Sequence, residues 1–311
     1  MTNRLTPEQK RFSFVVYRDF CLIIPTIKQR EQELYELLRY LLNLAEMPKK
    51  IIIVSDDTSG SISKIQKEYE RCGVELKFVK VTEGLTAGAH RNVGIKISNE
   101  YFLLFLDDDV LPDKRWLTEV KNCLQVRSDM VGGPSRPLFI KKTRPPIWWD
   151  QVLLGPYVAV GNEYIKSKTS AIWSCNLAVK KSIIENIGYF DETLGPRKYA
   201  RKTHMEDTEF VRRAVRHGLK VVFNPRAVVY HKLDHNRLIW KAYKKWAKDE
   251  GYSHRIFYQK TETNATVAFI RHMIFQIFRL FYSLLMRKSN PIATFPYMLL
   301  LLFQIEGYLG K

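Results

Sequence analysis

The feature that most constrains the fold is an alternation of short apolar runs with helical patterns in the first 125 residues. The apolar runs have the length and composition of buried strands, and the segments between them carry apolar residues at helical spacing. Strands that alternate with helices on short connections predict a mostly parallel sheet flanked by helices on both faces. The expected strands are 20–24, 51–54, 74–79 and 101–106, and the expected helices are 30–44, 62–72 and 87–97.

In such α/β sheets a ligand binds outside the carboxyl ends of the strands. The residues that follow the expected strands are Pro25-Thr26, Asp56-Asp57 and the triplet Asp107-Asp108-Asp109. The sequence therefore places a candidate site at these three strand ends.

Composition narrows the class of protein and of partner. The 311 residues are 46% apolar and 26% charged, which is typical of a folded globular chain. The net charge of +18 favours an anionic partner, which can be a nucleic acid, an anionic membrane or a phosphorylated substrate. The basic residues are spread over the chain and no nucleic-acid-binding motif is present, so nucleic acid is the least favoured of the three.

The cysteines and the first residues bear on the compartment. Cys21, Cys72, Cys123 and Cys175 stand far apart without zinc-site spacing, so free thiols of a reducing compartment are expected. The start MTNRLTPEQKRF has no apolar core of a signal peptide, and the catalytic part is expected in the cytoplasm.

The acidic triplet is the strongest chemical signal. Clustered carboxylates at a strand end suit Mg²⁺ or Mn²⁺, and in an extended chain Asp107 and Asp109 would share a face. The alternative is an acidic turn that caps a helix beginning near Lys114.

Two further segments are weaker signals. Asp56-Asp57, followed by the turn Thr58-Ser59-Gly60, can accept hydrogen bonds from a base or ribose, although an Asx turn explains it equally well. The segment GLTAGAHRNVG places Arg91 and Asn92 at a helix start, where backbone amides and the guanidinium can approach a diphosphate. Neither a Walker motif nor a GxGxxG fingerprint is present.

The second half holds a helix over 206–217 and strands over 219–223 and 227–230. The middle, 131–200, is irregular, and its tryptophans Trp148, Trp149 and Trp173 can stack on a sugar or be buried. The run Arg197–Lys202 is either a loop that closes over a diphosphate or a solvated charged segment.

The C-terminal segment is basic and amphipathic. Between Lys232 and Lys288 there are 12 Lys and Arg against 4 Asp and Glu. The polar residues His272, Gln276, Arg279, Ser283 and Arg287 form one narrow stripe on an otherwise apolar helix. This pattern indicates a helix in a membrane interface, since the later run 291–305 is shorter than the roughly 20 residues of a spanning helix. The alternative is a helical pair that packs on the catalytic domain or on a second subunit.

Six segments together resemble family 2 glycosyltransferases of the GT-A fold, over roughly residues 20–250. They are IIPTIKQREQELYELLRYLL, IIIVSDDTSG, GLTAGAHRNVGI, FLLFLDDDVLPDKRWL, SCNLAVKKSIIENIGYFDETLG and MEDTEFVRRAVRHGLKVVFNPRAVVYH, in the order of the family.

The resemblance implies a role for each matching residue. Pro25, Thr26, Asp56 and Asp57 would hold the nucleobase and ribose of a nucleotide-sugar, a UDP-sugar above all, and Arg91 and Asn92 would lie near its diphosphate. Asp107 to Asp109 match the DxD motif, in which Asp109, with Asp107 and His231, would hold Mn²⁺ or Mg²⁺ while Asp107 and Asp108 face the donor. Glu206-Asp207 match the ED motif, with Asp207 as the catalytic base. Trp173 and Asn176 are the weaker candidates for acceptor contacts.

The implied protein is an inverting hexosyltransferase that acts on a lipid-linked or cell-envelope glycan, with a GT-A-like domain over 1–235 and a basic helical region over 236–311. Within the domain, about 15–130 would bind the nucleotide-sugar and about 131–235 the acceptor. The helical region would associate peripherally with the inner face of the cell membrane, and a homo-oligomer is possible. The competing interpretations are a non-catalytic sugar-nucleotide-binding relative, a nucleotidyltransferase, and a basic nucleic-acid-binding protein. For the residues taken singly, Glu206 and Asp207 can be ordinary first-turn acids and His231 a core histidine.

Overall fold

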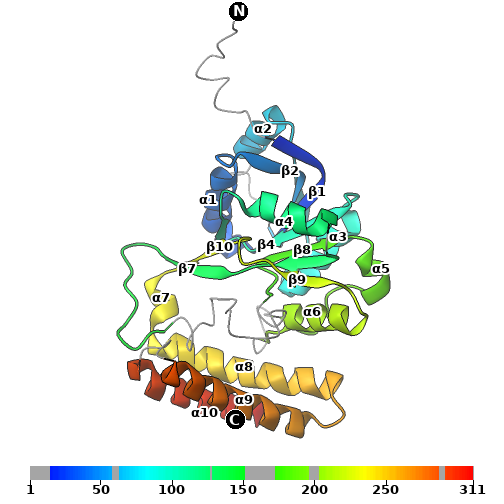
Figure 1. Ribbon diagram of the computed structural model, residues 1–311. Helices are drawn as coiled ribbons and strands as arrows, with labels where there is room; N and C mark the ends of the chain where they lie inside the picture. The colour runs from blue at the N-terminus through cyan, green and yellow to red at the C-terminus, as the bar shows by residue number, and fades with distance from the viewer. Residues whose placement is uncertain are drawn as a thin grey trace, which may run out of the picture.

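The computed structural model describes residues 15–57, 63–126, 128–150, 172–195, 203–286 and 291–310. The turn Thr58-Ser59-Gly60, the run Arg197–Lys202 and Arg287 lie outside these described residues. Within them the chain forms two sheets, helices on both faces of the larger sheet, and a C-terminal layer of helices (Figure 1).

The larger sheet has seven strands and is mostly parallel, as the sequence predicts. Strands β3, β2, β1 and β4 run parallel to one another, while β8 is antiparallel to both of its neighbours, β4 and β6. At the far edge β9 pairs parallel with β6. In sheet order the strands are β3 (Glu75–Lys80), β2 (Glu46–Ser55), β1 (Val15–Pro25), β4 (Phe102–Leu106), β8 (Asn176–Lys180), β6 (Met130–Gly132) and β9 (Val221–Phe223).

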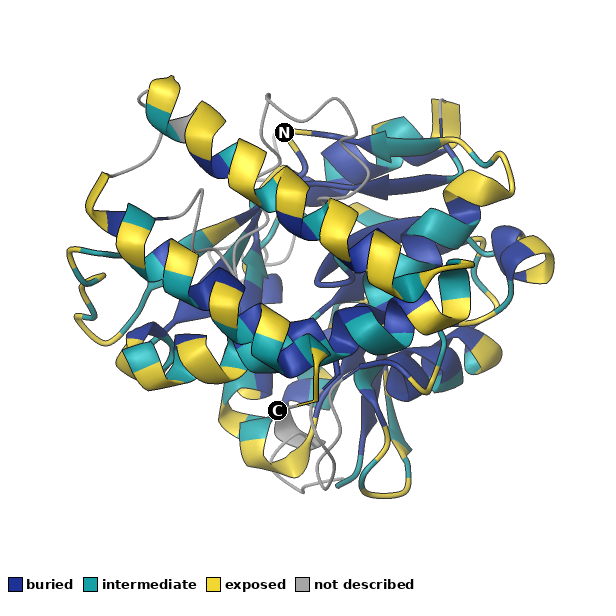
Figure 2. Ribbon diagram, turned by 90° about the horizontal axis from the view of Figure 1, so that it is seen from below, coloured by how far each residue is buried: buried dark blue, intermediate teal, exposed yellow. Residues whose placement is uncertain are grey.

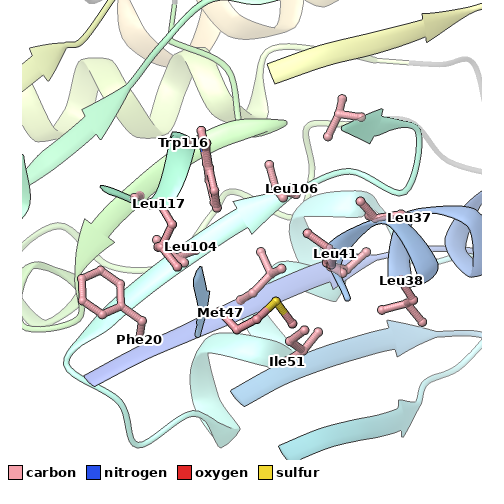
Figure 3. Close-up of a cluster of buried hydrophobic side chains, with 14 of the residues drawn as sticks. Phe20, Leu37, Leu38, Leu41, Met47, Ile51, Leu104, Leu106, Trp116 and Leu117 are labelled. Carbon is pink, nitrogen blue, oxygen red and sulfur yellow. The ribbon is translucent and has the colours of Figure 1, made fainter. Parts of the chain in front are cut away.

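Both faces of this sheet are buried, because successive side chains of a strand point to opposite sides. Along β1, Phe20, Leu22 and Ile24 join one apolar cluster, and Cys21 and Ile23 join another. Figure 3 shows part of the first cluster, in which Leu37 and Leu41 of a helix face the strands. The first cluster is covered by α1 (Glu31–Leu41), α2 (Ser63–Arg71) and α4 (Trp116–Val126), and the second by α3 (Ala87–Ile97), α5 (Ile183–Ile187) and α6 (Glu206–Arg216).

A second, three-stranded sheet places His231 beside the acidic triplet. It consists of β5 (Val110–Pro112), β10 (Val229–Leu233) and β7 (Ser135–Phe139), with β10 in the centre. Strand β5 begins directly after Asp109, and its Val110 is paired with His231. The backbone N–H of Lys232 also donates to the carbonyl oxygen of Asp109 at 2.9 Å. Residues more than 100 positions apart in the chain therefore become neighbours.

The C-terminal helices form a layer that lies across the lower side of the molecule in Figure 1. It contains the short α7 (His235–Leu238) and the longer α8 (Trp240–Thr261), α9 (Ala265–Leu285) and α10 (Thr294–Tyr308). Helices α8 and α10 contact through two glycines. A Cβ on Gly251 would lie 1.9 Å from the carbonyl oxygen of Gln304, and one on Gly307 would lie 2.0 Å from that of Lys248. Only glycine permits this backbone approach.

The layer also packs against two tryptophans of the irregular middle. Trp148 and Trp149 are partly buried against the cluster of α8 to α10, and the indole N–H of Trp149 donates to the hydroxyl of Tyr243 at 2.6 Å. For this pair the structure supports packing within the fold over sugar contacts.

The polar residues His272 and Gln276 of helix α9 face the protein. The His272 ring lies 4.1 Å from that of His254, and Gln276 accepts a hydrogen bond from the Tyr297 hydroxyl at 2.8 Å. Its apolar residues point outward, with Phe278 68% and Leu285 80% exposed, and Figure 2 shows exposed residues along the helices on this side. The exposed apolar face of α9 and α10 consists of Val267, Ile270, Ile274, Phe275, Ile277, Phe278, Phe281, Tyr282, Leu285, Phe295, Met298, Leu302 and Ile305.

No helix among the described residues has both the length and the apolar composition needed to cross a membrane. The four cysteines are free thiols, as the sequence predicts.

Candidate functional site

The candidate site is a cavity of about 580 Å³ where the ends of β1, β2 and β4 meet the start of α6 and the side of α8. This volume lies in the range of small-molecule binding sites. The sequence-predicted residues that line it are Pro25, Thr26, Asp56, Arg91, Asp107, Asp108, Trp173, Glu206, Asp207 and His231.

The acidic triplet leaves β4 as a turn, which corrects the expectation of an extended chain. The backbone N–H of Val110 donates to the carbonyl oxygen of Asp107 at 3.4 Å, so the chain curls and the side chains diverge. Asp107 contacts Arg91 at 2.6 Å, whereas Asp108 and Asp109 both contact Arg30, at 2.9 and 2.7 Å. Asp107 and Asp109 therefore do not share a set of partners.

The triplet is not the cap of the following helix. That task falls to Asp113, whose carboxylate accepts from the backbone N–H of Arg115 at 3.0 Å. Asp108 is held by the Thr26 hydroxyl, which donates to it at 2.6 Å. Burial raises the pKa of Asp108 to about 7, although Arg30 opposes this effect. Asp108 and Asp109 are thus held by contacts with β1 and its following loop, and Asp107 is held by Arg91 of α3.

Asp109 sits in a corner with three basic groups. Its Oδ2 contacts Arg30 at 2.7 Å and Arg237 at 2.6 Å, and its Oδ1 lies 3.2 Å from Nε2 of His231. Burial favours the neutral carboxyl, but contacts with His231, Arg30 and Arg237 hold the pKa of Asp109 well below its usual range. Asp109 is therefore an ionised carboxylate at neutral pH.

The same corner is a candidate for the implied metal ion. The oxygen of Asp109 and the nitrogen of His231 meet at one point, and both are suitable ligands for Mn²⁺. Asp107 is not turned to this point, because it contacts Arg91. Among the described residues no group of three or more His, Cys, Asp and Glu side chains can hold a metal. An ion at this corner would therefore have to take its remaining ligands from a diphosphate and water.

Arg91 joins the two acidic motifs. It is 2% exposed, and its guanidinium contacts Asp107 at 2.6 Å and Glu206 at 3.2 Å. A Cβ on Gly94 would lie 2.4 Å from Cγ2 of Ile23, so glycine there brings α3 close to β1 and holds Arg91 at this depth. Arg91 lines the cavity as expected, but its terminal nitrogens are already paired with two carboxylates.

The ED pair opens helix α6 and faces the cavity. Met205, the residue before it, has a left-handed φ of 79°, a conformation that costs a non-glycine residue roughly 1 kcal/mol or more. Asp207 accepts from the backbone N–H groups of Ser174, at 3.2 Å, and Thr208, at 2.7 Å. Burial, and then the neighbouring Glu206, raise the pKa of Asp207 to about 6. A carboxylate with this pKa is suited to accept a proton near neutral pH.

At the opposite end of the cavity, Asp56 accepts from the backbone N–H of Lys28 at 2.8 Å. Asp57 lies beside it and contacts the Lys28 ammonium at 2.9 Å. His90, which sequence reasoning did not single out, also lines the cavity, and burial lowers its pKa, so it is a neutral ring. The nucleobase end of the expected site is thus polar and largely preformed.

Two sequence-predicted contacts are wrong. Asn92 is buried and exchanges hydrogen bonds with the backbone of Phe190, at 2.9 Å in both directions, so it fastens α3 to the loop after α5. Asn176 is 2% exposed, accepts from the Trp116 indole at 2.8 Å and donates to the carbonyl oxygen of Ala227 at 2.8 Å. Both amides are used within the fold, which explains why asparagine is needed there.

Besides His90, four site residues escaped sequence reasoning: Arg30 and Arg237, which contact Asp109, and Trp246 and Glu250, which line the cavity from α8. Arg30 follows the strand end at Pro25 by only five positions, which could have pointed to it. The other three come from the C-terminal segment, which was interpreted through its overall charge and amphipathic pattern and not residue by residue.

Comparison with known proteins agrees with the fold. The model of glycosyl transferase family 2 matches residues 21–188, more than half of the chain. The chain is 25% identical over 211 residues to the "Probable glycosyltransferase YdaM" of Bacillus subtilis, covering 65% of this chain and 48% of that protein. It is 23% identical over 219 residues to the "Pre-mycofactocin glycosyltransferase" of Mycobacterium tuberculosis, covering 69% and 43%. The chain thus spans about half of the length of these relatives, or less.

Two solved structures share the fold at low sequence identity. The mannosyltransferase PcManGT from Pyrobaculum calidifontis, in complex with GDP-Man and Mn²⁺, has a TM-score of 0.59 at 14% identity, covering 94% of this chain and 87% of that one. The S. aureus TarS fragment 1–349, in complex with UDP-GlcNAc, has a TM-score of 0.51 at 19% identity, covering 78% and 71%. With the family match and a GT-A-like, mostly parallel sheet, these findings show that the chain belongs to glycosyl transferase family 2.

Proposed function

We propose that the protein is an inverting glycosyltransferase that moves a sugar from a nucleotide-sugar donor, a UDP-sugar above all, to a lipid-linked or cell-envelope glycan. The observation that carries the proposal is that Asp107 and Asp108 of the acidic triplet and both ED residues line one cavity, and that Arg91 joins Asp107 to Glu206. A binding-only relative would have no need of a buried carboxylate poised as a base.

The donor would lie along the carboxyl ends of β1, β2 and β4. Pro25, Thr26 and Asp56 would contact its base and ribose, and Arg30 beside Asp109 offers a positive charge for its diphosphate. The solved relatives bind UDP-GlcNAc in one case and GDP-Man in the other, so their ligands support a nucleoside diphosphate sugar in general.

The reaction needs charge compensation on one side of the sugar and a base on the other. A divalent cation held by Asp109 and His231 would neutralise the charge that builds on the leaving diphosphate. Asp207 would take the proton of the acceptor hydroxyl as it attacks the anomeric carbon. Burial and Glu206 raise the pKa of Asp207 to about 6, so most of it is ionised at neutral pH. A single displacement of this kind inverts the anomeric configuration.

The test is release of nucleoside diphosphate by the purified protein with Mn²⁺ across a panel of UDP-, GDP- and dTDP-sugars, with and without EDTA. Turnover of one donor should be lost with EDTA. Asp207→Asn should lower the rate by about 100- to 10,000-fold, and Asp109→Asn by about 100- to 1,000-fold. Asp113→Asn, outside the cavity, is the matched control.

The outcomes separate the rival functions. Binding of nucleoside diphosphate without turnover, unchanged in Asp207→Asn, would favour a non-catalytic relative. Absence of both turnover and binding, with salt-sensitive binding of nucleic acid, would favour the basic nucleic-acid-binding alternative.

The exposed apolar face of α9 and α10 supports a site of action at a membrane surface. The sequence left two interpretations of the tail, a helix in a membrane interface and a helical pair packed on the catalytic domain, and each describes one side of these helices. They pack on the protein through one side and expose apolar residues on the other. The net positive charge between Lys232 and Lys288 complements anionic lipid headgroups. We therefore propose that an anionic membrane covers this face.

Sedimentation with vesicles tests the membrane part by itself. The protein should bind vesicles that contain phosphatidylglycerol more tightly than phosphatidylcholine vesicles, and the double variant Phe278→Glu/Leu285→Glu should bind about tenfold or more weakly. Val126→Glu, equally exposed but on α4, should bind as the wild type does. A dimer in solution that the double variant converts to a monomer, without vesicle binding by the wild type, would assign the face to a second copy instead.

A further inference from the structure

Helix α8 contributes one wall of the cavity, opposite the donor side. Trp246 and Glu250 are separated by four positions and so lie on the same side of the helix. Both line the cavity that also contains Asp207, and Trp173 lines it from the other half of the chain. No other segment of the described C-terminal layer contributes lining residues to this cavity.

This wall is fixed in place by contacts on both sides of α8. On the side away from the cavity, Gly251 and Gly307 let α8 and α10 touch backbone to backbone. Toward the ED pair, the Ser253 hydroxyl accepts from the backbone N–H of His204 at 2.9 Å, two residues before Glu206. Helix α8 is therefore hydrogen-bonded directly to the segment that leads into the ED pair.

Glu250 is unusual because no counter-charge among the residues that the structure describes neutralises it. Its side chain is 21% exposed, and its Oε1 lies 3.7 Å from Nε2 of His254, which is too long for a hydrogen bond. His254 does not serve as a cation, because burial, together with His272 and Arg212, holds its pKa well below the usual range. Burial, and then the charges of Asp207 and Glu206, raise the pKa of Glu250 to about 7. A carboxyl of this kind can both donate and accept a hydrogen bond.

An aromatic ring next to a carboxyl group is the combination that binds carbohydrate. The indole packs on the apolar C–H face of a pyranose, while the carboxyl binds a hydroxyl at its edge. Asp207 in the same cavity is the expected base for the attacking hydroxyl, so a sugar against this wall would present that hydroxyl toward it.

We propose that Trp246 and Glu250 form the acceptor subsite, in which Trp246 stacks on the acceptor sugar and Glu250 binds a hydroxyl other than the attacking one. They are specificity-determining residues that select a polyhydroxylated acceptor and orient it. The inference rests on the proposed function and deepens it, because it assigns the acceptor class to residues outside the region that matches the family.

The test measures binding of an acceptor analogue without requiring turnover. Saturation-transfer NMR with a panel of methyl glycosides is recorded in the presence of Mg²⁺ and the nucleoside diphosphate that the protein binds. The wild type should bind at least one glycoside. Trp246→Leu and Glu250→Leu should weaken that binding about tenfold or more, while the affinity for the nucleoside diphosphate changes far less.

Conservative and control variants separate recognition from folding. Glu250→Gln keeps the shape and hydrogen-bonding capacity of the side chain, so it should retain most of the glycoside affinity, and Lys241→Gln on the exposed side of α8 should retain all of it. A melting temperature close to that of the wild type should accompany each variant.

Two results would overturn the subsite. One is a wild type that binds nucleoside diphosphate but none of the glycosides, and the other is glycoside binding that is unchanged in both leucine variants. Failure of the proposed function is distinct, since the protein would then bind no nucleoside diphosphate, or would bind it without turning over any nucleotide-sugar.

Discussion

The substitution Arg91→Met tests whether this arginine joins the two acidic motifs or serves the donor alone. Methionine keeps most of the length of the side chain and removes the guanidinium. It leaves Glu206 and Asp107 without their shared cation, at side-chain exposures of 9% and 31%. Removing one partner of a buried ion pair leaves an uncompensated buried charge, which costs about 3–5 kcal/mol. Because Asp107 is partly solvated, most of the cost falls on Glu206, and we expect the low end, about 3 kcal/mol.

The cost should depend on pH in a defined direction. Burial already raises the pKa of Glu206, and Arg91 opposes this. In Arg91→Met the pKa of Glu206 in the folded protein should rise further above its value in the unfolded chain. The folded state then binds more protons than the unfolded state, so stability falls as the pH rises from the unfolded value, about 4.3, through the folded one. The deficit relative to the wild type should be larger at about pH 7.5 than at about pH 5.

Urea unfolding at the two pH values measures this deficit, and calorimetric titration with a nucleoside diphosphate measures donor binding. Arg115→Met is the matched control. Arg115 lies just before α4 and is exposed, and its partner Glu119 keeps its contact with Arg226 at 3.2 Å, so the loss should be less than about 1 kcal/mol. A variant that binds the nucleotide more weakly yet unfolds at the wild-type urea concentration at both pH values would refute the joining role. Arg91 would then be assigned to the diphosphate contact that the sequence alone suggested.

Three further predictions concern the helix layer, the base and the metal. Gly307→Ala forces a methyl group against the carbonyl oxygen of Lys248, so thermal unfolding should show a loss of about 1–3 kcal/mol; an unchanged melting temperature would mean that α8 and α10 separate freely. Because Asp207 must be deprotonated to act as base and its pKa is raised to about 6, kcat/KM should fall roughly tenfold per pH unit below that value. In Asp207→Asn the residual rate should lack this inflection. Nucleoside diphosphate affinity measured with and without Mn²⁺ should depend on the ion in the wild type and lose that dependence in His231→Ala; equal affinities in the wild type would exclude an ion at this corner.

The sequence predicted the larger sheet well because its strands are continuous apolar runs. The run at Phe20–Ile24 is buried on both faces of the sheet, and such runs are recognised without periodicity. Strands β5 to β8 escaped, since they are only three to five residues long, and β5 and β7 contain Pro112 and Pro137. Their pairing depends on long-range contacts that no local pattern encodes. Helix α3, in contrast, was predicted with its observed bounds, Ala87–Ile97.

For the site, the sequence located residue types and missed their partners. The strand-end rule brought Thr26, Asp56, Asp107 and Asp108 to one cavity without any contact being known. Which carboxylate meets which cation depends on the curl of the turn after β4, which sends Asp107 to Arg91 and Asp109 to Arg237. Asn92 and Asn176 were assigned to ligand contacts for the same reason. The sequence alone does not distinguish a polar side chain that binds a ligand from one that forms hydrogen bonds within the fold.

Helix α8 has a place in the molecule that its amino-acid sequence does not reveal. One of its sides closes the cavity with Trp246 and Glu250, and another carries Gly251 against α10, whose exposed residues complete the apolar face. The backbone contact between α8 and α10 has no room for a side chain, so a displacement of α10 at a membrane surface would also displace Trp246 and Glu250 on α8. For an acceptor that is itself attached to lipid, this arrangement would set the height of the glycan above the bilayer relative to the base. Since such coupling requires a rigid α8–α10 contact, Gly307→Ala should weaken glycoside binding as well as stability, whereas loss of stability alone would show that the layer is only a support.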